Sequence, residues 1–181
     1  MREATPADLP PLHRLVERAY RGDSARQGWT HEADLLGGQR IDLAALAESV
    51  ADPARLILLA EGPDALEGCV EVRDLGGGRA YLGLLSVEPE RQADGLGRRL
   101  VAAAEAAARV RYDARVMEMT VIRQRPELIA WYERRGYRLT GEERPFPLDD
   151  PRFGLPTTRE LAFVVLEKVL RADLLPSFRS P

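Results

Sequence analysis

A glycine turn in the middle of the chain carries the clearest chemical signal. Gln92 is followed by Gly95 and Gly97, after an apolar run that ends at Val87. Glycines let a backbone turn tightly and approach a ligand closely. Free N–H groups at the start of a helix favour a negatively charged group such as a pyrophosphate. The spacing therefore predicts a phosphate-binding turn, and Arg98 adds positive charge beside it.

Two carboxylates on predicted strands are candidates for proton transfer. Glu71 and Glu118 each lie inside an apolar run, where a solvated carboxylate is unexpected. A carboxylate with a perturbed pKa can accept a proton from an amine. Both residues also fit an exposed strand face, which is the more common position for a glutamate.

The same glycines admit a second interpretation, the start of a dinucleotide-binding motif. Gly95 and Gly97 match the first two glycines of G-x-G-x-x-G, but Leu100 replaces the third. Glu118 lies at about the distance expected for an acid that binds a ribose. However, the turn follows a predicted antiparallel meander, whereas a dinucleotide fold places its motif after the first strand. The dinucleotide interpretation is therefore the weaker one.

Other chemistries have little support in the sequence. His13, His31 and Cys69 show no metal-ligand spacing, and we expect no metal site. Cys69 lies inside a predicted strand, where it fits a small core residue better than a nucleophile. The sequence contains neither a G-x-S-x-G elbow nor a P-loop.

Composition limits the class of protein. The 181 residues are 45% hydrophobic with a net charge of -3, which fits one globular domain over residues 1–181. Nucleic-acid binding needs clustered positive charge, and a membrane helix needs about 20 apolar residues; neither pattern is present. The first residues lack a secretory signal, and the single Cys69 cannot form an internal disulfide. We therefore expect a cytoplasmic protein that binds neither nucleic acid nor membrane.

Periodicity and turn signals predict the elements around the glycine turn. Before it, a helix runs from Thr5 to about Gly22, and a second helix covers residues 42–50. Three strands follow as a meander: residues 55–60, 66–73 and 80–87. After it, we expect an alanine-rich helix, a strand over 115–122, a helix over 126–136, a strand over 137–140, a loop over 141–159 and a strand over 161–169.

Residues 85–100 resemble the acyl-CoA-binding motif of the GNAT acetyltransferase superfamily, written Q/R-x-x-G-x-G/A. Gln92, Gly95 and Gly97 fill its three defined positions. The order of elements resembles that superfamily over nearly the whole chain. The resemblance implies an α/β fold of the α+β type: a central mixed, mostly antiparallel sheet flanked by helices on both faces.

A second segment, residues 125–137, resembles the superfamily pattern N-x-x-A-x-x-x-Y-x-x-x-G-F. Tyr132, Gly136 and Tyr137 match the pattern, whereas Arg125 stands where the family often has Asn. The resemblance implies that Tyr132 is the general acid toward the thiolate of CoA. Without the glycine turn, a core tyrosine would be the better interpretation of Tyr132.

The resemblance also implies which residues contact the acyl donor. A bulge near the end of the third meander strand leaves backbone groups for pantetheine and for the thioester carbonyl. The implied donor-binding residues are Leu85, Ser86, Val87, Gln92, Ala93, Asp94, Gly95, Leu96, Gly97 and Arg98.

The general base and the acceptor site follow less directly from the resemblance. Some family members have a Glu at the strand position that Tyr81 occupies here, so the catalytic base cannot be assigned from the family pattern. We choose Glu71 as the base, acting directly or through water. The acceptor site is expected between the first helices and the long loop. Its candidate wall residues, which fit loop packing equally well, are Trp29, Glu32, Phe146 and Phe153.

The expected activity is transfer of an acetyl group from acetyl-CoA to a primary amine by direct attack in a ternary complex, without a metal. The acceptor is either a small-molecule amine or a protein amine. The alternative is an acyl-CoA-binding sensor or interaction domain without turnover. The acyl chain length and the formation of a homodimer stay open.

Overall fold

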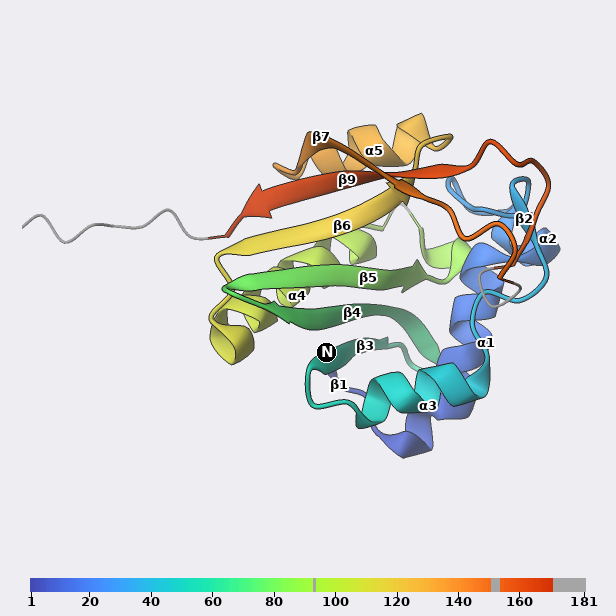
Figure 1. The fold of residues 1–181 in the computed structure, drawn as a ribbon. Coiled ribbons are helices and arrows are strands. Elements are labelled where there is room, and N and C mark those ends of the chain that lie inside the picture. The colour runs from blue at the N-terminus through green and yellow to red at the C-terminus, as the bar shows by residue number, and fades with distance from the viewer. Residues whose placement is uncertain (93, 151–153, 171–181) are drawn as a thin grey trace, which may run out of the picture.

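A computed structural model describes residues 1–92, 94–150 and 154–170. Its main feature is a seven-stranded sheet in the order β1-β3-β4-β5-β6-β9-β7 (Figure 1). The strands are β1 (Arg2–Glu3), β3 (Arg55–Glu61), β4 (Leu66–Gly76), β5 (Arg79–Val87), β6 (Val116–Ile122), β7 (Arg138–Pro145) and β9 (Ala162–Val169). Strands β2 (Leu36–Gly37) and β8 (Leu155–Pro156) form a separate antiparallel pair.

The predicted fold class is confirmed. Strands β3, β4 and β5 form the expected antiparallel meander, and only β5 and β6 are parallel neighbours in the main sheet described. The helices are η1 (Pro6–Asp8), α1 (Leu9–Tyr20), α2 (Gly22–Ala25), α3 (Leu43–Ala51), η2 (Pro89–Arg91), α4 (Leu96–Tyr112) and α5 (Pro126–Glu133). None of the helices in the described ranges is long and apolar enough to cross a bilayer.

Helices cover both faces of the sheet. Helices α4 and α5 lie behind it in Figure 1, where alanine-rich α4 packs Leu100 and Ala104 into the larger core with Met117 of β6. Helices α1 and α3 lie on the opposite face, where Leu12 of α1 and Leu46 of α3 form a second core. Asp42 caps α3 by accepting a hydrogen bond from the Ala45 N–H over 2.7 Å.

The expected loop over 141–159 is partly wrong. Strand β7 continues to Pro145, and Glu143 pairs with Val164 of β9 after a register shift. Leu155 also pairs with Gly37. Most side chains of β7 are exposed, so its sequence lacks the apolar alternation that identifies a half-buried strand. Backbone pairing at the sheet edge, rather than core packing, forms this extension.

Two irregularities of β5 shape the molecule next to the glycine turn. Parallel β5 and β6 pair only up to Tyr81 and Glu118, and then diverge toward their carboxyl ends (Figure 1). In the β4 ladder, Gly83 and Ser86 are paired but the two residues between them face a single residue. Leu84, in this bulge, has a φ of 50°. The bulge expected near Leu85 is therefore present, and it faces the gap between the strands.

Candidate active site

A cavity of about 180 Å³ lies beside the glycine turn and is here called the donor cavity. It lies at the carboxyl end of β5, where Leu85 and Val87 line it. The residues that line it are Ala19, Tyr20, Trp29, Thr30, Leu85, Val87, Gln92, Gly95, Gly97, Arg98, Arg125, Leu128, Trp131, Tyr132 and Arg135.

The glycine turn fits a ligand that approaches the backbone. Gly95 has a φ of 76° and precedes the first residue of α4, so it adopts a conformation that side chains disfavour. A Cβ on Gly97 would lie 3.4 Å from the Trp131 ring. The N–H groups of the first helical turn have no intrahelical acceptors. The turn therefore presents backbone N–H donors at the donor cavity. The lack of a side chain at Gly97 leaves room there for a ligand.

Positive charge gathers at the rim of the donor cavity. Arg98 and Arg135 both line it, and neither forms an ion pair in the described part of the chain. The Arg135 guanidinium lies 3.3 Å from the centroid of the Trp131 ring. Burial, followed by the charges of Arg134 and Arg98, lowers the pKa of Arg135. Unpaired guanidinium groups of this kind suit the phosphates of a ligand.

The bulge of β5 is held by side chains from other elements. The Tyr20 hydroxyl donates a hydrogen bond to the carbonyl of Leu85 over 2.7 Å. The Ser86 hydroxyl and the Cys69 thiol both donate to the carbonyl of Leu84. Burial raises the pKa of Cys69 to about 12, so this core cysteine stays a thiol rather than a nucleophilic thiolate.

Tyr132 lies between the donor cavity and a second, larger cavity. Its side chain is buried on α5, and its ring packs edge-on against Trp131 at a centroid distance of 4.9 Å. Burial raises the pKa of the Tyr132 phenol. The hydroxyl therefore stays protonated and can donate a hydrogen bond to an anion.

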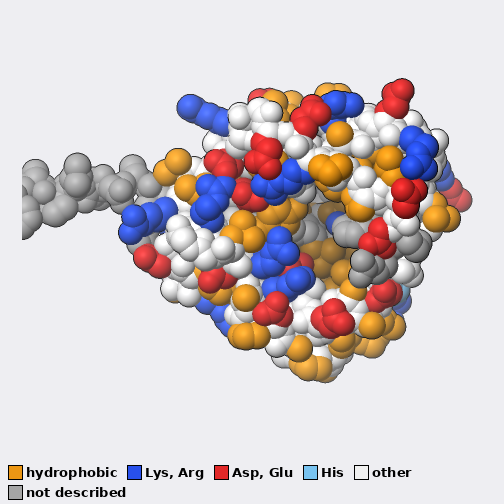
Figure 2. Space-filling model, viewed as in Figure 1, with side chains coloured by type: hydrophobic (Ala, Val, Ile, Leu, Met, Phe, Trp, Pro, Cys, Tyr) orange, Lys and Arg blue, Asp and Glu red, His pale blue; other side chains and the backbone are white. Residues whose placement is uncertain are grey.

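The second cavity, here called the acceptor cavity, has a volume of about 650 Å³ and opens on the face of the sheet shown in Figure 2. It shares Tyr20, Leu85, Arg125, Leu128 and Tyr132 with the donor cavity. The two cavities therefore meet at the bulge and at Tyr132. A ligand in one can reach a ligand in the other at this junction.

Glu71 lies in the wall of the acceptor cavity, on β4. Burial raises the pKa of its carboxyl, although Arg55, Arg73 and Arg40 act in the opposite direction. Arg55 donates a hydrogen bond to it over 3.3 Å. A raised pKa makes this carboxylate a better proton acceptor than an ordinary glutamate.

Glu118, the other candidate base, is in a different environment. It accepts hydrogen bonds from Arg79 over 2.7 Å and from Arg144 over 2.8 Å. Burial alone would raise its pKa, but the two arginines lower it. Glu118 lines neither cavity. The structure therefore favours Glu71 over Glu118 as a proton acceptor.

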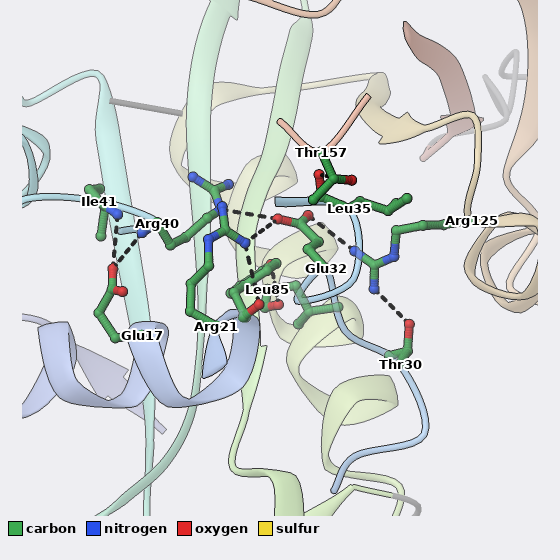
Figure 3. A network of polar contacts seen from close by, with 11 residues as sticks. Glu17, Arg21, Thr30, Glu32, Leu35, Arg40, Ile41, Leu85, Arg125 and Thr157 are labelled. Atoms are coloured by element: carbon green, nitrogen blue, oxygen red, sulfur yellow. Dashed lines mark hydrogen bonds and ion pairs between the residues drawn. The ribbon is translucent and has the colours of Figure 1, made fainter. Parts of the chain in front are cut away.

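Glu32 is the centre of a buried ion network (Figure 3). Its carboxylate accepts hydrogen bonds from Arg21 over 2.9 Å and from Arg125 over 3.1 Å, and Arg40 lies 4.0 Å away. Burial opposes ionisation, but these arginines lower the pKa of Glu32. Arg125 also donates to Thr30 over 2.6 Å. Glu32 thus joins the end of α1 to the start of α5 and is not a free base.

The remaining predicted residues lie in different places. Leu85, Val87, Gln92, Gly95, Gly97 and Arg98 line the donor cavity, as does the expected acceptor residue Trp29. Ser86 and Leu96 are buried, Asp94 is exposed beside Arg91, and none of these three lines either cavity. Phe146 packs against Phe163 at a centroid distance of 5.0 Å and lines neither cavity. Ala93 and Phe153 lie outside the described residues.

Several lining residues carried no signal in the sequence. Tyr20 belongs to the apolar stripe of α1, which hides its hydrogen bond to the bulge. Arg125 replaces a family Asn and is buried between Glu32 and Thr30. Trp131 comes directly before Tyr132 in the sequence. Its position next to Gly97 of α4 depends on how the chain folds, so the sequence pattern did not reveal it. No group of three or more potential metal ligands occurs within residues 1–92, 94–150 and 154–170.

Comparisons with known proteins agree with this geometry. Residues 25–146 match a family model described as an acetyltransferase (GNAT) domain. The fold is similar to that of yncA from Salmonella typhimurium, solved with its cofactor acetyl-CoA, at 19% identity over 98% of this chain and 96% of that chain, with a TM-score of 0.67. It is also similar to the ribosomal-protein-S18-alanine N-acetyltransferase of Escherichia coli, at 14% identity over 96% of each chain, with a TM-score of 0.70.

A third structure with a similar fold is nourseothricin acetyltransferase, at 24% identity over 66% of this chain and 68% of that chain, with a TM-score of 0.57. A search of curated proteins found no match to the sequence.

Proposed function

The chain belongs to the GNAT acetyltransferase family, and from this premise we propose that it transfers an acetyl group from acetyl-CoA to a primary amine. The observation that carries the proposal is that Gly97 and Tyr132, from separate helices, line one cavity at the bulge of β5. Acetyl-CoA supplies the acetyl group in activated form, as a thioester. The names of similar structures state different acceptors, among them nourseothricin, a ribosomal-protein alanine and spermidine.

The donor cavity has the groups that an acyl-CoA needs. The first turn of α4 offers backbone N–H groups to the pyrophosphate, and Arg98 and Arg135 add positive charge. The bulge at Leu84 and Leu85 removes two residues from regular pairing with β4. Backbone groups there would hold the pantetheine arm and polarise the thioester carbonyl.

The acceptor amine would enter from the acceptor cavity and attack the thioester directly. The new N–C bond forms while the C–S bond breaks, giving an amide and the thiolate of CoA. An alkylammonium has a pKa near 10.4 and a thiol a pKa near 8.5, so removal of the amine proton is the harder step at neutral pH. We assign this proton to Glu71, directly or through water, because its raised pKa favours proton acceptance.

Tyr132 would act on the leaving group. Its phenol stays protonated, so it can donate a hydrogen bond to the thiolate sulfur as the C–S bond breaks. Since burial raises the pKa of Tyr132 above that of a thiol, we propose stabilisation by a hydrogen bond, with the thiolate finally taking its proton from solvent or from the amine.

Amine-dependent release of CoA tests the proposal. The purified protein is incubated with acetyl-CoA and a panel of amines, free thiol is measured, and the N-acetyl product is identified by mass spectrometry. We expect CoA release only with an acceptor amine and in equal amount to the amide formed. Binding of acetyl-CoA without transfer to any amine would instead support an acyl-CoA-binding domain without turnover.

A further inference from the structure

One guanidinium group in the acceptor cavity has no anionic partner. Arg73 lies on β4, and its Cζ stacks over the ring of Tyr81 at 5.1 Å from the centroid. Its Nε is buried without a hydrogen-bond partner, and the side chain forms no ion pair in the described part of the chain. A buried N–H group without a hydrogen-bond acceptor is costly. An anion from a ligand would remove this cost.

The other arginines that line this cavity contrast with Arg73. Arg55 lies 3.2 Å from Asp52 and 3.3 Å from Glu71. Arg125 is hydrogen-bonded to Glu32, and Arg40 lies 4.0 Å from the same carboxylate. Asp52, Glu71 and Glu32 thus each have an arginine partner, whereas exposed Glu48, which also lines the cavity, forms no ion pair in the described part of the chain. Among the arginines of the cavity, Arg73 is therefore the one that remains for an anionic group of the acceptor.

The position of Arg73 relates the anion to the reacting amine. Arg73 and Glu71 lie on the same face of β4, about 7 Å apart along the strand. Both line the acceptor cavity, and the charge of Arg73 acts on the Glu71 carboxyl. A molecule whose amine approaches Glu71 therefore brings a nearby anionic group within reach of Arg73. The planar guanidinium matches a carboxylate through two parallel hydrogen bonds.

We propose that Arg73 binds the carboxylate of the acceptor, and that the acceptor is a free amino acid. This inference rests on the proposed acetyl transfer. The Arg73 guanidinium lies over the Tyr81 ring, and the Tyr81 hydroxyl is hydrogen-bonded to Thr120 over 2.6 Å. Figure 2 shows the hollow on this face, with basic, acidic and hydrophobic side chains around it. Apolar residues such as Ile41 face the amino-acid side chain.

The test compares acids with their neutral analogues. Acetyl transfer is measured with each of the twenty L-amino acids, with the α-amide of each one that reacts, and with spermidine. We expect kcat/KM to be at least about tenfold higher for an acid than for its amide, because the amide leaves the guanidinium without its anion. Arg73→Gln should abolish this preference, because kcat/KM for the acid falls to about the value for its amide. The exposed Arg14, which lines neither cavity, provides the matched control Arg14→Gln, which should keep the preference.

Two results would overturn the role of Arg73: equal rates for acids and amides, or equal loss of both in Arg73→Gln. Preference for spermidine would overturn it as well.

If no amine reacts, the proposed transfer fails, and a binding experiment tests the role of Arg73 separately. Calorimetry with CoA present then compares N-acetyl-L-leucine with N-acetyl-L-leucinamide: tighter, Arg73-dependent binding of the acid supports the carboxylate site, and equal binding excludes it. An unchanged melting temperature shows that Arg73→Gln is folded.

Discussion

The Tyr20 hydroxyl at the end of α1 donates a hydrogen bond to the carbonyl of Leu85 in the bulge of β5, over 2.7 Å. Both residues line the donor cavity and the acceptor cavity. Helix α1 therefore fixes the segment of β5 that our account places against the thioester. The geometry of the junction depends on a contact between residues 65 positions apart in the sequence.

Removal of the hydrogen bond between Tyr20 and Leu85 should lower both the stability and the activity of the protein. Tyr20→Phe leaves the Leu85 carbonyl without its donor, and we expect the free energy of unfolding to fall by about 1 kcal/mol. The Tyr112 hydroxyl is buried without a hydrogen-bond partner in the described part of the chain, so Tyr112→Phe is a matched control that should not lower stability. Denaturant titration compares the two variants; equal losses would contradict the role of the Tyr20 hydroxyl.

Substitution of Gly97 should separate stability from donor binding. Gly97 has a helical backbone in α4, so Gly97→Ala should keep or raise the free energy of unfolding by up to about 1 kcal/mol. Its new Cβ would lie 3.4 Å from Trp131 in the donor cavity. We therefore expect acetyl-CoA affinity to fall about tenfold, or about 1.4 kcal/mol, by calorimetry. Gly37→Ala, outside this cavity, should bind normally, and unchanged affinity in Gly97→Ala would exclude the turn from the donor site.

Tyr132 should affect turnover more than binding. Tyr132→Phe removes the hydrogen bond that we propose for the thiolate, so we expect kcat to fall by about ten to several hundredfold with acetyl-CoA affinity preserved. Tyr137 is a neighbouring buried tyrosine, 5.8 Å away between ring centroids, whose hydroxyl donates to Glu105. Tyr137→Phe should lower stability but not kcat. Unchanged kcat in Tyr132→Phe would remove Tyr132 from the mechanism.

The pH dependence of the rate should report Glu71. Because burial raises the pKa of its carboxyl above 4.5, kcat/KM should fall as the pH decreases through that raised pKa and the base becomes protonated. Glu71→Gln should lower the rate at pH 7 by about a hundredfold and remove this acidic limb. Glu118→Gln should keep the limb, since Glu118 lines neither cavity. An unchanged limb in Glu71→Gln would contradict the assignment.

The same substitution has a stability readout with a defined sign. A carboxyl with a raised folded-state pKa contributes stability at low pH, and that contribution is lost as the pH rises through the folded pKa. Glu71→Gln should therefore not lower the free energy of unfolding at pH 7, which distinguishes a chemical role from a loss of folding.

Substitution of Glu32 should lower the free energy of unfolding at pH 7, in contrast to Glu71→Gln. Its pKa is lowered by arginines, so its contribution to stability is present above the unfolded pKa and is lost as the pH falls through the folded pKa. Glu32→Gln removes the buried negative charge that Arg21 and Arg125 share, and we expect a loss of about 3–5 kcal/mol in chemical denaturation at pH 7. Asp23 pairs with Arg26 at the surface, so Asp23→Asn should cost less than about 1 kcal/mol. Similar costs for both variants would contradict the network.

The sequence predicted those features that depend on local pattern. Apolar runs separated by turn signals identified β3, β4 and β5, and the spacing of Gly95 and Gly97 identified the turn before α4. The extension of β7 was not predictable, because its exposed side chains carry no alternation and its pairing depends on β9. The two adjoining cavities were not predictable either, since their shared lining residues come from α1, β5 and α5 and meet only in the folded chain.

Charged side chains show the same limit most clearly. Glu32, predicted as a wall residue of the acceptor site, does line the acceptor cavity, but its hydrogen bond to Arg125, 93 positions away, could not be predicted from the sequence. Arg73 was not among the candidate residues predicted from the sequence, because an arginine on a strand is ordinary until its neighbours are known. Only the folded chain distinguishes the paired guanidinium of Arg55 from the unpaired one of Arg73.

Calorimetric titration with acetyl-CoA, CoA and NAD tests for an acyl-CoA site at the glycine turn without requiring the acceptor amine. We predict that acetyl-CoA and CoA each bind at one site per chain, that NAD does not bind, and that Gly97→Ala weakens binding of both CoA species. Binding of NAD without CoA, or of neither class of ligand, would contradict an acyl-CoA site at the glycine turn.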